Sequence, residues 1–162
     1  MNATHKRRLL KLADLLMKDA RRKKGVKFDL NNWAAPVDGP KDEDGHEAFA
    51  TKPKTVPVNC GTYACAVGLA CISGEFKRSG LGLDFMESHD EDGKPVFIPR
   101  PKYRGLINWR AVEAFFGVTY EQSYALFGTG AYDVSTGAEA ERAVARRIRD
   151  LVAGKDITLD VP

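Results

Sequence analysis

The sequence predicts an α+β fold: a mainly helical single domain over residues 1–162, with a buried small-residue central helix and one β-hairpin. Three observations support this prediction. The run GTYACAVGLACI at 61–72 has no polar face, and apolar residues alternate on both sides of a turn-forming segment at 90–93. Apolar residues also recur at helical spacing near both ends of the chain. A chain of 162 residues can bury a core without a disulfide framework or a structural metal.

Composition narrows the class of protein. A hydrophobic fraction of 43% and a charged fraction of 29% exclude a disordered, collagen-like or membrane protein. No apolar run approaches the ~20 residues of a membrane-spanning helix, and no signal-peptide core follows the basic residues near the N-terminus. Three cysteines cannot all pair with one another, which favours free thiols in a reducing compartment. We therefore expect a cytoplasmic protein without a membrane partner.

Residues 1–25 predict a basic amphipathic helix that ends at Gly25. Its apolar positions are Leu9, Leu12, Ala13, Leu16 and Ala20. The cations fall mostly on the opposite face: Arg7, Arg8, Lys11, Lys18, Arg21 and Arg22. Clustered cations can bind the phosphates of a nucleic acid, but a solvated helix face is the more common explanation for such a run. Both interpretations stay open.

The middle of the chain predicts an extended anchor, a long loop, a helix and a hairpin. Residues 26–33 would bury Phe28, Leu30 and Trp33, and residues 34–59 form a long acidic, proline-rich surface loop. The apolar run at 61–72 would be the central helix, capped by Asn59, with Gly68 allowing close approach of another backbone. Alternation at 81–98, around the turn at 90–93, predicts the β-hairpin.

The C-terminal third predicts three helices and a tail at 155–162. The first helix stops at Gly117, and the second begins with a capping box formed by Thr119 and Gln122. The third helix is expected to begin with another capping box, formed by Thr136 and Glu139, and to stop before residue 155. The second of these helices, which would be the recognition helix of a helix-turn-helix, has no Arg or Lys to contact DNA, and this favours a packed helical hairpin.

Three stretches together resemble a loosely defined group of short bacterial and phage proteins with a CGTxACxxGxA signature. They are Phe28-Asp29-Leu30-x-x-Trp33; Cys60-Gly61-Thr62-x-Ala64-Cys65-Ala66-x-Gly68-x-Ala70; and a downstream series of Phe116-Gly117-Val118-Thr119, Ala125-Leu126-Phe127 and Thr136-Gly137-Ala138-Glu139. The group has no established activity. The resemblance therefore implies a folded, cytoplasmic bacterial or phage protein and transfers no catalytic residue.

Cys60 is the sharpest enzymatic candidate in the sequence. A thiol just ahead of a helix gains thiolate character from the helix N-terminus, and a thiol-dependent enzyme would need His46 or His89 as its base. Neither histidine has the neighbours of a protease motif, and a cysteine before an apolar run also suits the core. We therefore expect Cys60 to be structural and favour no catalytic residue.

Metal and cofactor motifs are also weak. The spacing of the three cysteines matches no zinc site, and the acidic segment at 88–93 fits a hairpin turn better than a calcium loop. The sequence thus predicts no metal and no cofactor. The leading hypothesis is a small accessory protein that acts by non-enzymatic protein binding or regulation. Nucleic-acid binding through the first helix and a thiol enzyme centred on Cys60 are the alternatives.

Overall fold

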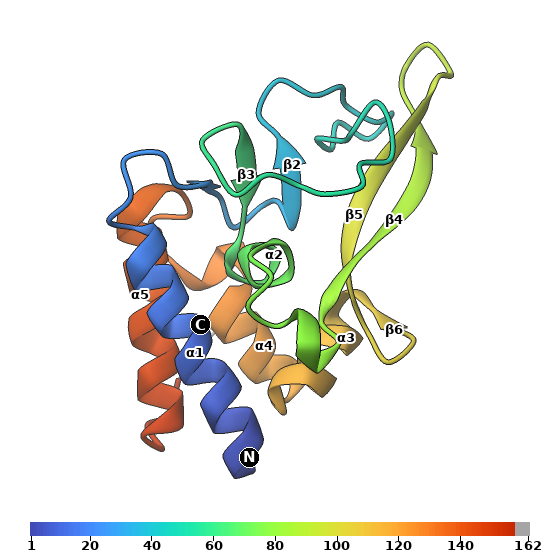
Figure 1. The fold of residues 1–162 in the computed structure, drawn as a ribbon. Helices are drawn as coiled ribbons and strands as arrows, with labels where there is room; N and C mark the ends of the chain where they lie inside the picture. The colour runs from blue at the N-terminus through green and yellow to red at the C-terminus, as the bar shows by residue number, and fades with distance from the viewer. Residues whose placement is uncertain (158–162) are drawn as a thin grey trace.

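Two long helices at the ends of the chain lie side by side and form one flank of the molecule (Figure 1). The computed structural model describes residues 1–157 and confirms the α+β fold. Its helices are α1 (Ala3–Asp19), α2 (Ala66–Ile72), α3 (Asn108–Phe116), α4 (Tyr120–Phe127) and α5 (Gly137–Val152), with short 3₁₀ turns at Lys77–Ser79 and Thr129–Ala131. Its strands are β1 (Lys27–Phe28), β2 (Ala34–Pro36), β3 (Thr62–Ala64), β4 (Gly82–His89), β5 (Pro95–Tyr103) and β6 (Leu106–Ile107).

The core lies where the apolar faces of the helices meet. Leu9, Leu12 and Leu16 of α1 are fully buried, as are Val144 and Ile148 of α5. Burial of an aliphatic side chain of this size contributes roughly 1.5–3 kcal/mol to folding. The spacing of these residues places them on one face of each helix, so the α1–α5 pairing follows directly from the sequence pattern.

The predicted helix at 61–72 is shorter than expected. Its first residues form β3, the centre of a small sheet of order β1-β3-β2, in which β1 is parallel and β2 antiparallel to β3. The backbone of 62–64 stays extended because strands pair with it on both sides, and α2 begins only at Ala66. Asn59 is not its cap, since its Oδ1 accepts from the Gly61 amide in a turn. Cys65 caps α2 instead, with Sγ accepting from the Gly68 amide at 3.4 Å.

The expected close approach at Gly68 is confirmed. A Cβ atom at this position would lie 1.3 Å from the backbone oxygen of Trp33, which no side chain can accommodate. The Cys65 amide donates to the Asn32 oxygen at 2.8 Å, so the segment before β2 is tied to the start of α2. Glycine at this position therefore allows α2 to sit directly beneath the small sheet.

The predicted hairpin is confirmed as β4 and β5, which project away from the helices (Figure 1). A third strand, β6, pairs with β5. The protein therefore has two three-stranded sheets, whereas the sequence predicted a single hairpin. Strand β5 carries Pro95, Pro99 and Pro101, whereas β4 has no proline. The expected turn at 90–93 is present, and Asp90 accepts from the amides of Asp92 and Lys94.

The C-terminal helices begin and end mostly as expected. Gly117 ends α3 with a φ of +65°, and the capping box of Thr119 and Gln122 is present. The second capping box is wrong, because Thr136 makes no capping hydrogen bond. Thr136 still stands at the N-cap position, but the first helical residue, Gly137, has a φ of +78° in place of the usual helical geometry on which a capping box depends.

Three segment boundaries in the structure also differ from the predicted ones. Helix α1 ends at Asp19 and not at Gly25, because residues 20–25 turn the chain from α1 into β1. The predicted loop at 34–59 begins with β2, and it meets β5 through an antiparallel bridge between Phe49 and Phe97. In the predicted tail, Ile157 is buried, and residues 158–162 lie outside the described residues.

Candidate functional site

The structure separates Cys60 from the helix that was expected to activate it. Cys60 is exposed in the turn before β3, and the helix cap is Cys65, a buried thiol whose pKa is raised to about 11 by desolvation. His89 is exposed at the end of β4, and His46 contacts Asp42. Within residues 1–157, no hydrogen bond joins Cys60 to either histidine. In the described part of the chain, Cys60 thus has neither the helix N-terminus nor the histidine base of a catalytic thiol, and the expectation that it packs in the core is wrong because its turn leaves it exposed.

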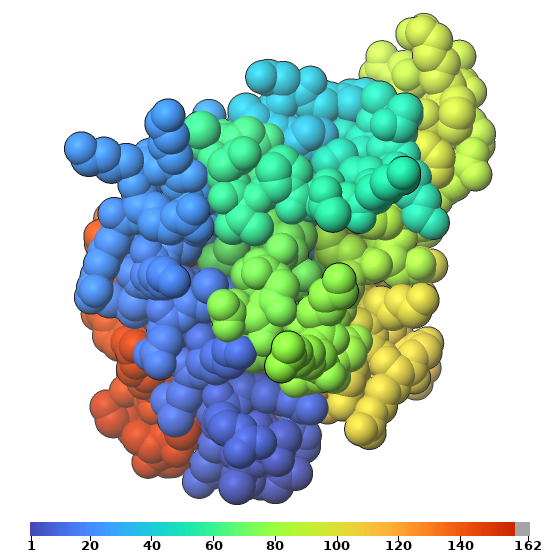
Figure 2. All heavy atoms as spheres, in the orientation of Figure 1, coloured from blue at the N-terminus to red at the C-terminus, as the bar shows by residue number. Residues whose placement is uncertain are grey.

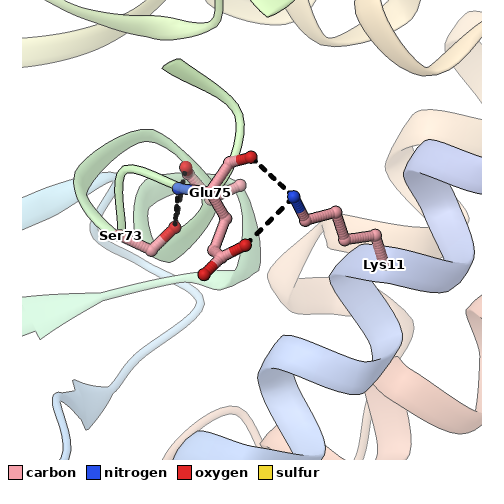
Figure 3. A network of polar contacts seen from close by, with 4 residues as sticks. Lys11, Ser73 and Glu75 are labelled. Carbon is pink, nitrogen blue, oxygen red and sulfur yellow. Dashed lines mark hydrogen bonds and ion pairs between the residues drawn. The ribbon is translucent and has the colours of Figure 1, made fainter. Parts of the chain in front are cut away.

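Three of the six cations proposed for nucleic acid are engaged within the protein. Arg8 donates to the Phe115 carbonyl at 2.8 Å and lies over the Phe115 ring. Lys11 donates to the Glu75 carbonyl and pairs with the Glu75 carboxylate at 3.0 Å, which joins α1 to the turn after α2 (Figure 3). Arg22 lies 3.6 Å from the Asp19 carboxylate.

The other three cations, Arg7, Lys18 and Arg21, are exposed on one face of α1 and the turn that follows it. Figure 2 shows α1 and this turn at the molecular surface, where long side chains of the turn stand away from the body. These three side chains are therefore available to a partner.

A small acidic cluster in the loop at 42–46 has an internal explanation. Ligand atoms of Asp42, Asp44 and His46 all lie within 4.8 Å of one another. Asp42 is buried, but its carboxylate accepts from the Asp44 and His46 amides and contacts the His46 ring at 3.1 Å. These contacts brace the loop and account for the burial of Asp42 without a cation.

The strongest candidate site lies at the end of the α1–α5 pair where α1 stops and α5 begins. Asp19 is the last residue of α1, and Glu141 lies one turn into α5. Their relative exposures are 4% and 2%, which is rare for carboxyl side chains. Gly25 packs against Asp19 so closely that an added Cβ would lie 2.7 Å from Oδ2.

Three of the four oxygens of these two buried carboxyls accept no hydrogen bond. Both carboxyl oxygens of Asp19 and Oε1 of Glu141 have no hydrogen-bond partner. Arg22 approaches Asp19 at 3.6 Å, which is an ion-pair distance and too long for a hydrogen bond. An unsatisfied buried acceptor costs about 1–3 kcal/mol, and more when it is charged. The pair is therefore a local cost to stability.

Both carboxyls line a pocket of about 430 Å³, which we call the carboxylate pocket. It is bounded by the end of α1 and the turn after it, by β1 and β3, and by the first turn of α5. Its lining residues are Asp19, Ala20, Arg22, Val26, Lys27, Phe28, Asp29, Tyr63, Thr136, Gly137, Ala138 and Glu141. Apolar and aromatic side chains thus line the pocket together with the two buried acids, a third acid and two cations.

Burial raises the pKa of both acids, and the charge of Asp19 raises the pKa of Glu141 further. Desolvation and then the charge of Asp19 raise the pKa of Glu141 to about 8, against the opposing charge of Arg142. Desolvation likewise raises the pKa of Asp19, although the Arg22 guanidinium and the nearby Val26 amide oppose that shift. Glu141 therefore carries a proton for much of the time at neutral pH.

The sequence interpretation missed this site, although a signal was present. Asp19 follows Leu16 by three positions, and Glu141 precedes Val144 by three, so each acid lies in phase with an apolar stripe. An acid on an apolar face is the pattern that marks such a site. It does not reveal that the two acids meet, because that requires the pairing of the first and last helices.

No helix within residues 1–157 combines the length and apolarity needed to cross a lipid bilayer. Comparison of the chain with protein-family models, with curated proteins and with solved structures found no match in any of the three. The resemblance to the CGTxACxxGxA group therefore stays a prediction, and the case for function rests on the geometry of the carboxylate pocket.

Proposed function

We propose that this protein is a small cytoplasmic accessory protein of a bacterium or phage that acts without catalysis, by binding another protein through the carboxylate pocket. The observation that carries the proposal is the pair of buried carboxyls, Asp19 and Glu141, whose oxygens lack donors at the wall of an open pocket. The free thiols of all three cysteines agree with a reducing compartment.

The energetics support a role in binding. Replacing either acid by a neutral residue would remove a desolvation cost, and the recurrent cost of such stabilising changes is lost function where a binding site is held in a destabilised state. A pocket with apolar walls and a few convergent polar groups is also the common form of a ligand site. A bound partner that supplies donors would offset the cost that the free protein carries.

The experiment compares partner capture by three forms of the full chain after nuclease treatment of a bacterial host lysate. Thr136→Trp blocks the pocket at an exposed position that makes no capping bond, and Ala114→Trp adds the same bulk on the exposed side of α3. We expect a specific protein to be retained by the wild type and by Ala114→Trp and lost from Thr136→Trp. Equal capture by all three forms, with unchanged melting temperatures, would refute the proposal.

A second candidate function is nucleic-acid binding through α1. It is supported by Arg7, Lys18 and Arg21, which are exposed on one face of the helix and the adjacent turn. Phosphate contacts by such cations give affinity that falls steeply with salt. A captured component that disappears on nuclease treatment, whatever the state of the pocket, would favour this candidate.

A further inference from the structure

We propose that the group bound in the carboxylate pocket is the guanidinium of an arginine side chain presented by the partner protein. This inference rests on the proposed function, because it names the chemistry of the ligand at the same site. It is drawn from the unmet hydrogen-bonding capacity of the buried acids, the polarity of the helix end beside them and the apolar walls of the pocket.

The first step is the match between donors and acceptors. Asp19 and Glu141 together present three buried oxygens that accept no hydrogen bond, and each carboxyl, once ionised, can only accept. A guanidinium supplies five N–H donors in a planar fork and bonds carboxylates in a bidentate manner, whereas an ammonium offers three donors around a point. Two acids of one pocket with three unpaired, buried oxygens therefore suit arginine better than lysine, provided that the ligand displaces the Arg22 side chain beside Asp19.

The second step is the local field. Asp19 is the last residue of α1, so the partial negative charge of that helix end adds to its own. A third acid of the pocket, Asp29, accepts from the Asn31 and Asn32 side chains, and it contributes charge while its oxygens are occupied. The buried ionisable groups of the pocket are thus acids, whereas its cations, Arg22 and Lys27, belong to exposed residues. The unpaired oxygens belong to the two buried acids.

The third step is room for the aliphatic stem of arginine. Val26 and Phe28 are buried beside the acids, and Tyr63 and Ala138 complete an apolar wall. A volume of about 430 Å³ admits a side chain of this length, and the methylene groups would pack on that wall while the head reaches the acids. The exposed residues Lys27 and Thr136 lie at the rim.

Arg22 provides an internal precedent for this chemistry. Its guanidinium lies 3.6 Å from Asp19 Oδ1 while the side chain remains half exposed. The site therefore already attracts a guanidinium, but its own arginine does not reach hydrogen-bond distance. An incoming arginine would displace the Arg22 side chain toward solvent and donate hydrogen bonds to the unpaired oxygens of Asp19 and Glu141.

A divalent metal fits less well. Within residues 1–157, the only group of three or more potential ligand residues with atoms inside 4.8 Å is Asp42, Asp44 and His46, which lies in a different pocket. The carboxylate pocket offers no such group, and Ca²⁺ or Mg²⁺ needs several oxygen ligands. The apolar wall would also be of no use to a bare ion.

Arginine binding in this pocket should release a proton, because Glu141 must ionise to pair with the ligand. The charged and titratable groups that face it come from α1 and its turn, β1 and the residue after it, β3 and α5: Asp19, Arg22, Lys27, Asp29, Tyr63 and Arg142. With a pKa of about 8 for Glu141, affinity should rise close to tenfold between pH 6 and pH 7.

The test titrates the full-length protein with N-acetyl-arginine methylamide and follows amide shifts by NMR. The matched probe is the citrulline analogue, which has the same shape without the charge. We expect saturable shifts at the carboxylate pocket with a Kd on the order of 1 mM for the arginine probe. The citrulline probe and the Asp19→Asn variant should each bind at least tenfold more weakly, and Glu139→Gln, an exposed change on the same helix, should bind as the wild type does.

Several results would overturn the inference. A guanidinium site would be excluded by equal affinity for the two probes or by the absence of a saturable shift with the arginine probe. It would also be excluded if Ca²⁺ or Mg²⁺ bound at the carboxylate pocket more tightly than the arginine probe does. If Thr136→Trp abolishes partner capture while the arginine probe neither binds nor competes, the proposed function stands and the ligand chemistry is wrong. If the arginine probe binds but Thr136→Trp captures the partner as well as the wild type does, the proposed function is wrong.

Discussion

The Glu141→Gln variant should be more stable than the wild type, by an amount that grows with pH. The folded pKa of Glu141 is about 8, compared with an ordinary value of 4.5. Between those values the folded state binds more protons than the unfolded state, so stability falls as pH rises through the window. At 1.36 kcal/mol per pKa unit, the stability difference between variant and wild type should increase by about 3 to 4 kcal/mol from pH 5 to pH 8.

Urea denaturation at both pH values measures this difference directly. Glutamine keeps the size of the side chain and removes the titration, so the comparison isolates one group. Glu139→Gln, on the exposed side of the same helix, is the matched control for the loss of one acidic side chain from α5. If Glu141→Gln shows a pH-independent difference, Glu141 does not carry a raised pKa, and the argument from a desolvated acid pair fails.

Three further predictions concern the fold and the alternative functions. Gly68→Ala should destabilise the protein by at least about 3 kcal/mol or prevent folding, because the new Cβ would overlap a backbone oxygen. The control variant Gly82→Ala, whose Cβ would have nothing within 4 Å, should change stability little. Similar melting temperatures for the two variants would contradict the close contact at Gly68. In the native protein at pH 8, iodoacetamide should modify Cys60 rapidly and the two less exposed thiols, buried Cys65 and partly buried Cys71, only on unfolding. Rapid labelling of all three thiols, detected by mass spectrometry, would contradict this difference in exposure. If the three exposed cations of α1 contact duplex phosphates, the log–log salt slope of binding should be about −2.7, and no binding at low salt would remove the nucleic-acid candidate.

Local sequence patterns predicted the elements whose shape depends on near neighbours in the chain. The β4–β5 hairpin follows from alternation around a turn, and the stop at Gly117 follows from a positive φ that glycine adopts readily. The two sheets show the limit of this approach. β3 lies in an apolar run that suits a buried helix equally well, and only pairing with β1 and β2, which are distant in sequence, keeps it extended.

The candidate site could not be predicted for the same reason. Asp19 and Glu141 each break an apolar stripe, and that much is visible in the sequence. Their burial, their missing donors and the pKa of Glu141 arise from the packing of α1 on α5 and from the turn at Gly25, which covers Asp19. The thiol that was singled out in the sequence, Cys60, instead lies exposed in a turn.

The carboxylate pocket forms only where the first and last helices meet, and this has a consequence for the order of folding. The hydrogen bond from Arg142 to the Ala20 carbonyl spans 122 residues, whereas the β4–β5 hairpin and the α3–α4 pair close over short loops. Long loops close later because their closure costs more entropy, so we expect the pocket to be the last feature to assemble. Stopped-flow refolding should show hairpin contacts before a probe placed at residue 136. A chain released from the ribosome would then become competent to bind only when its final helix has docked.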